Sequence, residues 1–158
     1  MIVVAIVAIL ALIAVPNFSD KFVREQIIDS VKLADIAKTP IALQWAAAGT
    51  MPVDNGAAGL PPAVMIVNNY ISSVAVESGA IQVTFGNHAN PAIQGKTLSL
   101  RPGVIDGQPI VPVAWVCGFA EPPLNMAVKG LNKTNVAPIY LPFNCRSSGP
   151  ASAPSGSP

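Results

Sequence analysis

Residues with side chains that can do chemistry are few in this sequence and lie far apart. His88 is the single histidine, and no cluster of cysteine or carboxylate residues surrounds it. Metal sites need several such ligands at short spacing. The sequence also shows no glycine-rich phosphate loop, nucleophile elbow or paired carboxylates. We therefore expect no catalytic residue, no metal and no cofactor, and we interpret His88 as a solvated loop residue.

Two cysteines, Cys117 and Cys145, are the next candidates, with 27 residues between them. In a reducing compartment such a pair is usually two free thiols in the core, whereas export to an oxidising compartment favours a disulfide. The two cysteines alone leave both readings open.

Three basic residues lie near the second cysteine, and the sequence holds two glycosylation motifs. Lys129, Lys133 and Arg146 either gather into a basic patch that could receive DNA or are ordinary surface charges, and the second reading is favoured. Asn132 and Asn17 each begin an Asn-X-Ser/Thr triplet, a pattern that is common by chance.

Composition limits the classes of function. The 158 residues suit one domain, and nine basic against eight acidic residues give a net charge of +1, which does not indicate nucleic acid. Charged residues make up 11%, compared with about 25% in an average soluble protein. The sixteen prolines argue against a helical bundle and for extended segments and loops.

The first fifteen residues carry no charge, and ten of them are Ile, Val or Leu. As a helix they would extend about 22 Å, which is less than the roughly 30 Å of a bilayer core. A signal peptide would begin with basic residues, but no Lys or Arg precedes Lys21. The segment is therefore apolar enough for lipid but short, and a buried core helix is the less favoured alternative.

An amphipathic pattern follows this run. Val23, Ile27, Val31 and Ala34 repeat at helical spacing among charged residues, which predicts a helix that lies against a domain. We expect one long helix over residues 1–50, with a kink or a melted turn at Pro16 and an end near residue 49.

The rest of the chain predicts a sheet. We expect a connecting loop over residues 51–79, with a short edge strand at 74–76. Antiparallel strands should follow within 80–117, at 81–85, at 98–100 and in the stretch 110–119, where the third strand ends at Cys117. Residues 118–146 and a Ser/Pro-rich tail at 147–158 complete the chain. The predicted class is α+β, a long N-terminal helix packed on three to four antiparallel strands.

At this point the sequence resembles the type IV pilins and the related type II secretion pseudopilins. The stretch from Met1 to Leu10, continuing through Ala14-Val15-Pro16, is similar to the hydrophobic start of the mature family chain. The segment Tyr140–Arg146, YLPFNCR, resembles the end of the family's disulfide-bounded region. The resemblance implies the helix-and-sheet fold and a Cys117–Cys145 disulfide, worth about 3.5 kcal/mol in the chain-entropy model.

The match starts six residues inside the usual mature chain of the family. A family glutamate, which compensates the terminal amine of a neighbouring subunit, would stand two residues before Met1. Adding six residues would lengthen the apolar segment to about 31 Å, enough for a bilayer core. Our hypothesis is that Met1 is an internal methionine of a longer chain, which the mass of the native subunit would test.

The resemblance implies a structural subunit of a bacterial type IV pilus, which serves adhesion, motility or DNA uptake. Its partners would be copies of itself, the inner membrane before assembly, the pilus assembly machinery, and surfaces or DNA. Alternatives are a minor pilin or DNA receptor, a secretion pseudopilin and, more distantly, a membrane-tethered enzyme. The apolar helix would leave the membrane to form the core of an extracellular filament, with packing residues Ile2, Val3, Ile6, Ile9, Leu10 and Ile13.

The tail has no apolar side chain larger than Ala, apart from Pro, so we expect it to remain extended or disordered. Some similar pilins carry O-linked sugars on Ser/Pro-rich ends. The candidate positions here are Ser147, Ser148, Ser152, Ser155 and Ser157.

Overall fold

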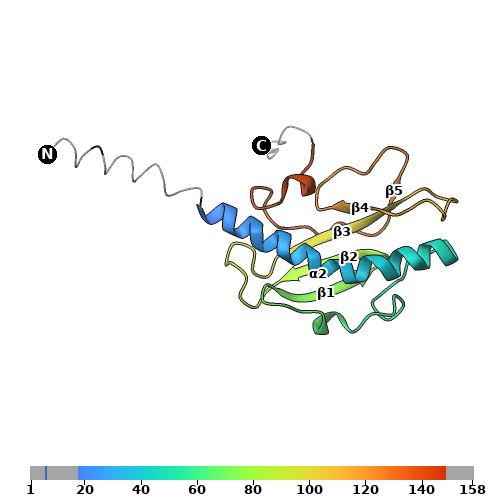
Figure 1. Ribbon diagram of the computed structural model, residues 1–158, viewed down its shortest axis with the longest axis horizontal. Coiled ribbons are helices and arrows are strands. Elements are labelled where there is room, and N and C mark those ends of the chain that lie inside the picture. The colour runs from blue at the N-terminus through green and yellow to red at the C-terminus, as the bar shows by residue number, and fades with distance from the viewer. Residues whose placement is uncertain (1–5, 7–17, 149–158) are drawn as a thin grey trace, which may run out of the picture.

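The computed structural model describes residue 6 and residues 18–148. It confirms the α+β class, because one long helix lies across one face of an antiparallel sheet (Figure 1). In chain order the elements are α2 (Phe18–Ala48), the short 3-10 helix η1 (Ala63–Met65), strands β1 (Ile71–Glu77), β2 (Ala80–Phe85), β3 (Thr97–Val104), β4 (Ala114–Cys117) and β5 (Ala127–Val128), and the 3-10 helix η2 (Phe143–Cys145).

Helix α2 forms because its buried residues recur every three or four positions, with Ser30 between Ile27 and Ala34 as a polar member. One stripe along the helix faces the sheet and contributes Val23, Ile27, Ala34, Ala37, Ile41 and Trp45 to the core. The helix continues through Pro40 and ends before Gly49, whose positive φ of 66° lets its N–H bond the Trp45 carbonyl at 2.8 Å. Among the described residues, no helix combines the length and apolarity needed to cross a membrane.

The sheet has the order β1-β2-β3-β4, with each strand antiparallel to the next. Ile81, Val83 and Phe85 of β2, with Leu98 and Leu100 of β3, are fully buried in the core that α2 shares. The short strand β5 pairs with the end of β3, outside this path. The sheet therefore has four main strands and a two-residue fifth, slightly more than the sequence predicts.

Strand β1 lies in the segment that we assigned to the connecting loop. The expected short strand at 74–76 falls in the second half of a seven-residue strand that begins at Ile71. The pairing with β2 shifts register between Ile71 and Ser73, so the strand does not show a regular alternation of apolar and polar residues. This irregularity explains why the sequence pattern indicated only its last part.

Two prolines affect the strands at the other side of the sheet, Pro112 before β4 and Pro102 inside β3. The strand expected at 110–119 begins only at Ala114, after Pro112, which cannot donate a ladder hydrogen bond. Pro102 lies inside β3, but β2 pairs with β3 only as far as Leu100. Beyond that point the Pro102 carbonyl accepts the Lys129 N–H at 2.9 Å, next to β5. Proline has no backbone N–H, and it is tolerated at position 102 because no β2 carbonyl lies opposite to accept a hydrogen bond.

The side chain of Asn55 covers the outer edge of β1. Its Oδ1 accepts the Val76 N–H at 2.6 Å, and its Nδ2 donates to the Val74 carbonyl at 3.0 Å and to the Pro61 carbonyl at 2.9 Å. The amide thus replaces the peptide group of a further strand. Asn55 is buried, although it lies in the segment 51–79 that the sequence indicated only as a connecting loop.

Replacing Asn55 with Ala should lower the free energy of unfolding by about 1–3 kcal/mol, because the Val76 N–H and the Val74 carbonyl lose their partner. Urea unfolding followed by circular dichroism would measure the change. Asn69→Ala is the matched control, since Asn69 is exposed and the hydrogen bonds of the described residues do not use its side chain. Equal effects of the two variants would contradict the role of Asn55.

Candidate subunit interface and disulfide-bounded loop

The side of α2 that faces away from the sheet carries several large apolar residues. We define the outer face of α2 as Phe22, Ile28, Ile36 and Leu43, which are 44–64% exposed. Phe22, Ile36 and Leu43 fall on multiples of seven positions, so they follow one line along the helix. Charged residues separate them, including the exposed Asp29–Lys32 pair at 2.9 Å. The sheet of this chain leaves the outer face uncovered.

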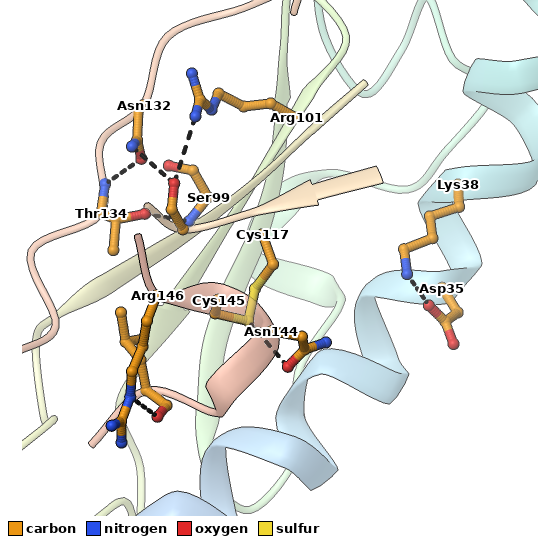
Figure 2. Close-up of a disulfide and its surroundings, with 12 residues drawn as sticks. Asp35, Lys38, Ser99, Arg101, Cys117, Asn132, Thr134, Asn144, Cys145 and Arg146 are labelled. Atoms are coloured by element: carbon orange, nitrogen blue, oxygen red, sulfur yellow. Dashed lines mark hydrogen bonds and ion pairs between the residues drawn. A yellow bond between two sulfur atoms is a disulfide. The ribbon is translucent and has the colours of Figure 1, made fainter. Parts of the chain in front are cut away.

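A mostly apolar cleft of about 320 Å³ lies beside α2, where the helix meets β4 and the second cysteine. It contains one cation, Lys38, whose Nζ lies 2.7 Å from Asp35 Oδ1 (Figure 2). The same Nζ lies 5.9 Å from the ring centre of Trp115. Its lining residues are Ile28, Val31, Lys38, Leu100, Trp115, Cys117, Pro142, Asn144 and Cys145. Such a lining suits an apolar side chain better than a polar ligand.

Cys117 and Cys145 form a disulfide that joins the end of β4 to η2 (Figure 2). Both are buried, with 6% and 2% of their surface exposed. A backbone hydrogen bond joins the same two segments, because the Phe119 N–H donates to the Cys145 carbonyl at 2.9 Å. Gly118 between them has a φ of 54°, and a Cβ there would lie 2.8 Å from the same carbonyl oxygen. Only glycine fits this junction without strain.

The disulfide closes a loop whose middle lies against buried polar side chains of β2 and β3, whereas its end returns to α2. Ser99 of β3 binds the middle of this loop, because its N–H donates to Thr134 Oγ1 at 3.0 Å and its Oγ accepts the Lys133 N–H at 2.8 Å. Gln82 of β2 donates to the Leu131 carbonyl at 3.0 Å and accepts the Ser99 hydroxyl at 2.5 Å. Both polar side chains are buried and satisfied. These bonds hold the loop where apolar packing is sparse.

The possible glycosylation triplet Asn132-Lys133-Thr134 lies within these contacts. Asn132 Nδ2, the atom that would carry the sugar, donates to the Gly118 carbonyl at 2.8 Å, and the Thr134 hydroxyl accepts the Ser99 N–H. Arg101 donates to the same Gly118 carbonyl, and burial lowers the pKa of its guanidinium. The triplet is therefore engaged in holding the loop in the folded chain. Asn17, in the other triplet, lies outside the described residues.

Each of the three cations considered as a basic patch has its own partner. Lys129 pairs with Asp106 at 2.7 Å, and Lys133 pairs with Glu77 at 2.5 Å. Arg146 donates from Nε to the Leu141 carbonyl at 2.9 Å. Their partners lie on separate elements, which agrees with ordinary surface charge.

The remaining predicted residues lie on the surface or outside the described part. Ser147 and Ser148 are exposed, and Ile6 is helical and 52% exposed. His88 is an exposed loop residue. Within residues 18–148, no group of three or more His, Cys, Asp or Glu side chains is placed to hold a metal ion. Outside the described residues lie Ile2, Val3, Ile9, Leu10, Ile13, Pro16, Ser152, Ser155 and Ser157.

One contact that sequence reasoning missed joins the start of α2 to the end of the loop. Arg24 donates from its terminal nitrogen Nη2 to the Ile139 carbonyl at 2.8 Å, across 115 positions of sequence. Arg24 occupies an ordinary charged position of an amphipathic helix, so no pattern in the sequence could have identified its partner.

Comparisons with known proteins agree on one family. The family model for pilins, which form bacterial filaments, matches residues 23–146. The chain is 37% identical over 119 residues to the type IV major pilin protein PilE of Neisseria gonorrhoeae, covering 75% of this chain and 69% of that protein. It is 34% identical over 152 residues to a type IV major pilin protein PilE1 of the same species, with coverages of 92% and 82%. The fimbrial protein EcpC of Eikenella corrodens is 32% identical over 149 residues, with coverages of 92% and 85%.

Proposed function

This chain belongs to the pilin family, and from that membership we propose that it is the major structural subunit of a bacterial type IV pilus. Its copies polymerise through the long helix into an extracellular filament that serves adhesion, motility or DNA uptake. The names of the similar proteins, which are major pilins and fimbrial proteins, support this role over that of a minor pilin or a secretion pseudopilin.

The outer face of α2 is the observation that carries the proposal. The sheet covers only one stripe of the helix, and large apolar side chains stay exposed on the other side. Complete burial of one such side chain contributes about 1.5–3 kcal/mol, so contact with other copies would be favourable. The apolar cleft beside Trp115 offers a second surface for side chains of a neighbouring copy.

The sequence before α2 supports a membrane stage. We infer that the apolar run of residues 1–15 rests in the inner membrane before assembly, with the sheet domain on the outer side. The pilus assembly machinery then moves the helix from lipid into the filament core. The apolar surface avoids water throughout, because it exchanges lipid for the helices of neighbouring copies.

Substituting Lys for both Ile36 and Leu43 should reduce the yield of filaments at least tenfold, because assembly would bury two ammonium groups without partners. Sheared filaments would be counted by electron microscopy, with the cellular amount of subunit measured by immunoblot. Val64→Lys is the control, since Val64 is an exposed apolar residue of η1 and lies outside α2. A wild-type yield from the double variant would show that the outer face does not carry assembly.

A further inference from the structure

Two arginines from opposite ends of the described chain meet at one carbonyl oxygen. Arg24 of α2 donates to the Ile139 oxygen at 2.8 Å, and Arg146, directly after η2, donates to the same oxygen at 3.1 Å. The two donor nitrogens, both Nη2, therefore lie within about 6 Å of each other. Figure 1 shows η2, the last described element, near the N-terminal half of α2. Two like charges at this distance repel each other.

Both guanidiniums have spare capacity for hydrogen bonds. Each offers five N–H donors, and together they use three, one from Arg24 and two from Arg146, all to backbone carbonyls. Arg24 Nε is buried and has no hydrogen-bond partner among the described residues. All four ion pairs within residues 18–148 involve lysines, so no carboxylate there neutralises either arginine. An anion with several acceptor oxygens would relieve the repulsion and fill the free donors.

The position of the pair indicates where such an anion would come from. Arg24 lies six positions after Phe18, about 9 Å along α2, and Phe18 follows the apolar run by three positions. Side chains of a helix point toward its N-terminus, here toward that run. If the run rests in a bilayer, as proposed above, the pair comes close to the lipid head groups, a layer about 5–8 Å deep on each side.

We propose that Arg24 and Arg146 together bind the phosphate of an anionic lipid head group while the subunit is stored in the membrane. The choice of lipid over free phosphate rests on the proposed membrane stage, whereas the phosphate chemistry rests on the arginine pair alone. Binding would hold the last loop and the start of α2 in one orientation to the bilayer. A nucleic acid is less suitable, because the net charge of +1 supplies no broad positive field.

The test uses the full chain in maltoside micelles, which contain no phosphate. Short-chain phosphatidylglycerol, inorganic phosphate, a DNA duplex and diacylglycerol of the same chain length are each titrated, and the Nε–H signals of Arg24 and Arg146 are followed by NMR. We expect phosphatidylglycerol to shift both signals, phosphate to shift them only at tenfold or higher concentration, and diacylglycerol to leave them unchanged. DNA acting at lower concentration than the lipid would overturn the proposal.

Variants separate a shared site from general attraction of charge. Arg146→Gln should weaken the response of the Arg24 signal to phosphatidylglycerol at least tenfold, and Arg24→Gln should do the same to the Arg146 signal. Lys21→Gln is the matched control, because it removes the same charge from an exposed position three residues before Arg24 and should change binding less than twofold. Should a glutamine variant unfold, Arg24→Lys and Arg146→Lys keep the charge but lose the planar fork, with an expected weakening of about threefold to tenfold.

Besides the DNA result, three others would overturn the proposal: a shift with diacylglycerol, equal losses from Lys21→Gln and Arg24→Gln, or full binding by Arg146→Gln. Equal potency of phosphate and phosphatidylglycerol would overturn the lipid assignment and leave a site for free anions. Measuring the filament yield of the same cells distinguishes a failure of the lipid proposal from a failure of the proposed function. A wild-type chain that binds the lipid but forms no filaments would contradict only the proposed function.

Discussion

Replacing both Cys117 and Cys145 with Ser is expected to lower the free energy of unfolding by about 3.5 kcal/mol. The bond has a sequence separation of 28, and in the chain-entropy model its removal restores the freedom of that loop to the unfolded chain. The hydrogen bonds of Ser99 and Gln82 to the loop would remain, so the sheet should survive at low temperature. Urea unfolding of the oxidised wild type and the double variant measures the difference.

Hydrogen exchange would show where the disulfide acts. The Asn135 and Phe119 amides, which bond Thr97 and Cys145 carbonyls, should lose protection in the variant before the amides between β1 and β2 do. Wild-type protein under reducing conditions is the control and should behave like the double variant. A loss of stability below 1 kcal/mol would mean that the loop is held mainly by its hydrogen bonds.

Substituting Ala for Gly130 should destabilise the fold by about 2–5 kcal/mol. Gly130 has a φ of 76°, where an L-residue carries about 1–2 kcal/mol of strain. A Cβ there would also lie 2.5 Å from Ala80 Cβ and 3.1 Å from the Glu77 carbonyl, so the loop would have to move away from the β1–β2 turn. Thermal unfolding and the protection of the neighbouring amides would both report the displacement.

Gly107→Ala separates strain from crowding. Gly107 has nearly the same φ, 74°, but a Cβ there would meet no atom within 4 Å. Its substitution should therefore cost only the backbone strain of about 1–2 kcal/mol. If both alanine variants lose the same stability, the close approach of Gly130 to Ala80 contributes nothing.

The parts of the fold that local sequence patterns determine could be predicted. The stripe through Val23 and Ile27 indicated α2, Gly49 indicated its end, and alternating apolar residues indicated β2 and β3. The similarity of the first residues to pilins indicated the family, which the comparisons confirm. These features depend on neighbours in sequence or on a short shared motif.

Features that depend on distant partners could not be predicted. Asn55 bonds the edge of a strand about twenty positions away, and a single sequence does not mark which loop amide will do this. Arg24 and Arg146 bond the same carbonyl although all the strands of the sheet lie between them in the sequence. The start of β1 was missed because a shift of register hides its alternation. In each case the determining contact is tertiary.

Asn55 has a consequence for how copies can stand side by side. An exposed strand edge offers unpaired N–H and C=O groups with which the sheet of an adjacent molecule can fuse, and such fusion leads to aggregation. Here one carboxamide occupies the places at Val74 and Val76 where that fusion would begin. This part of the β1 edge is therefore closed to the sheet of a neighbouring copy, and contacts between copies there are left to helices and side chains.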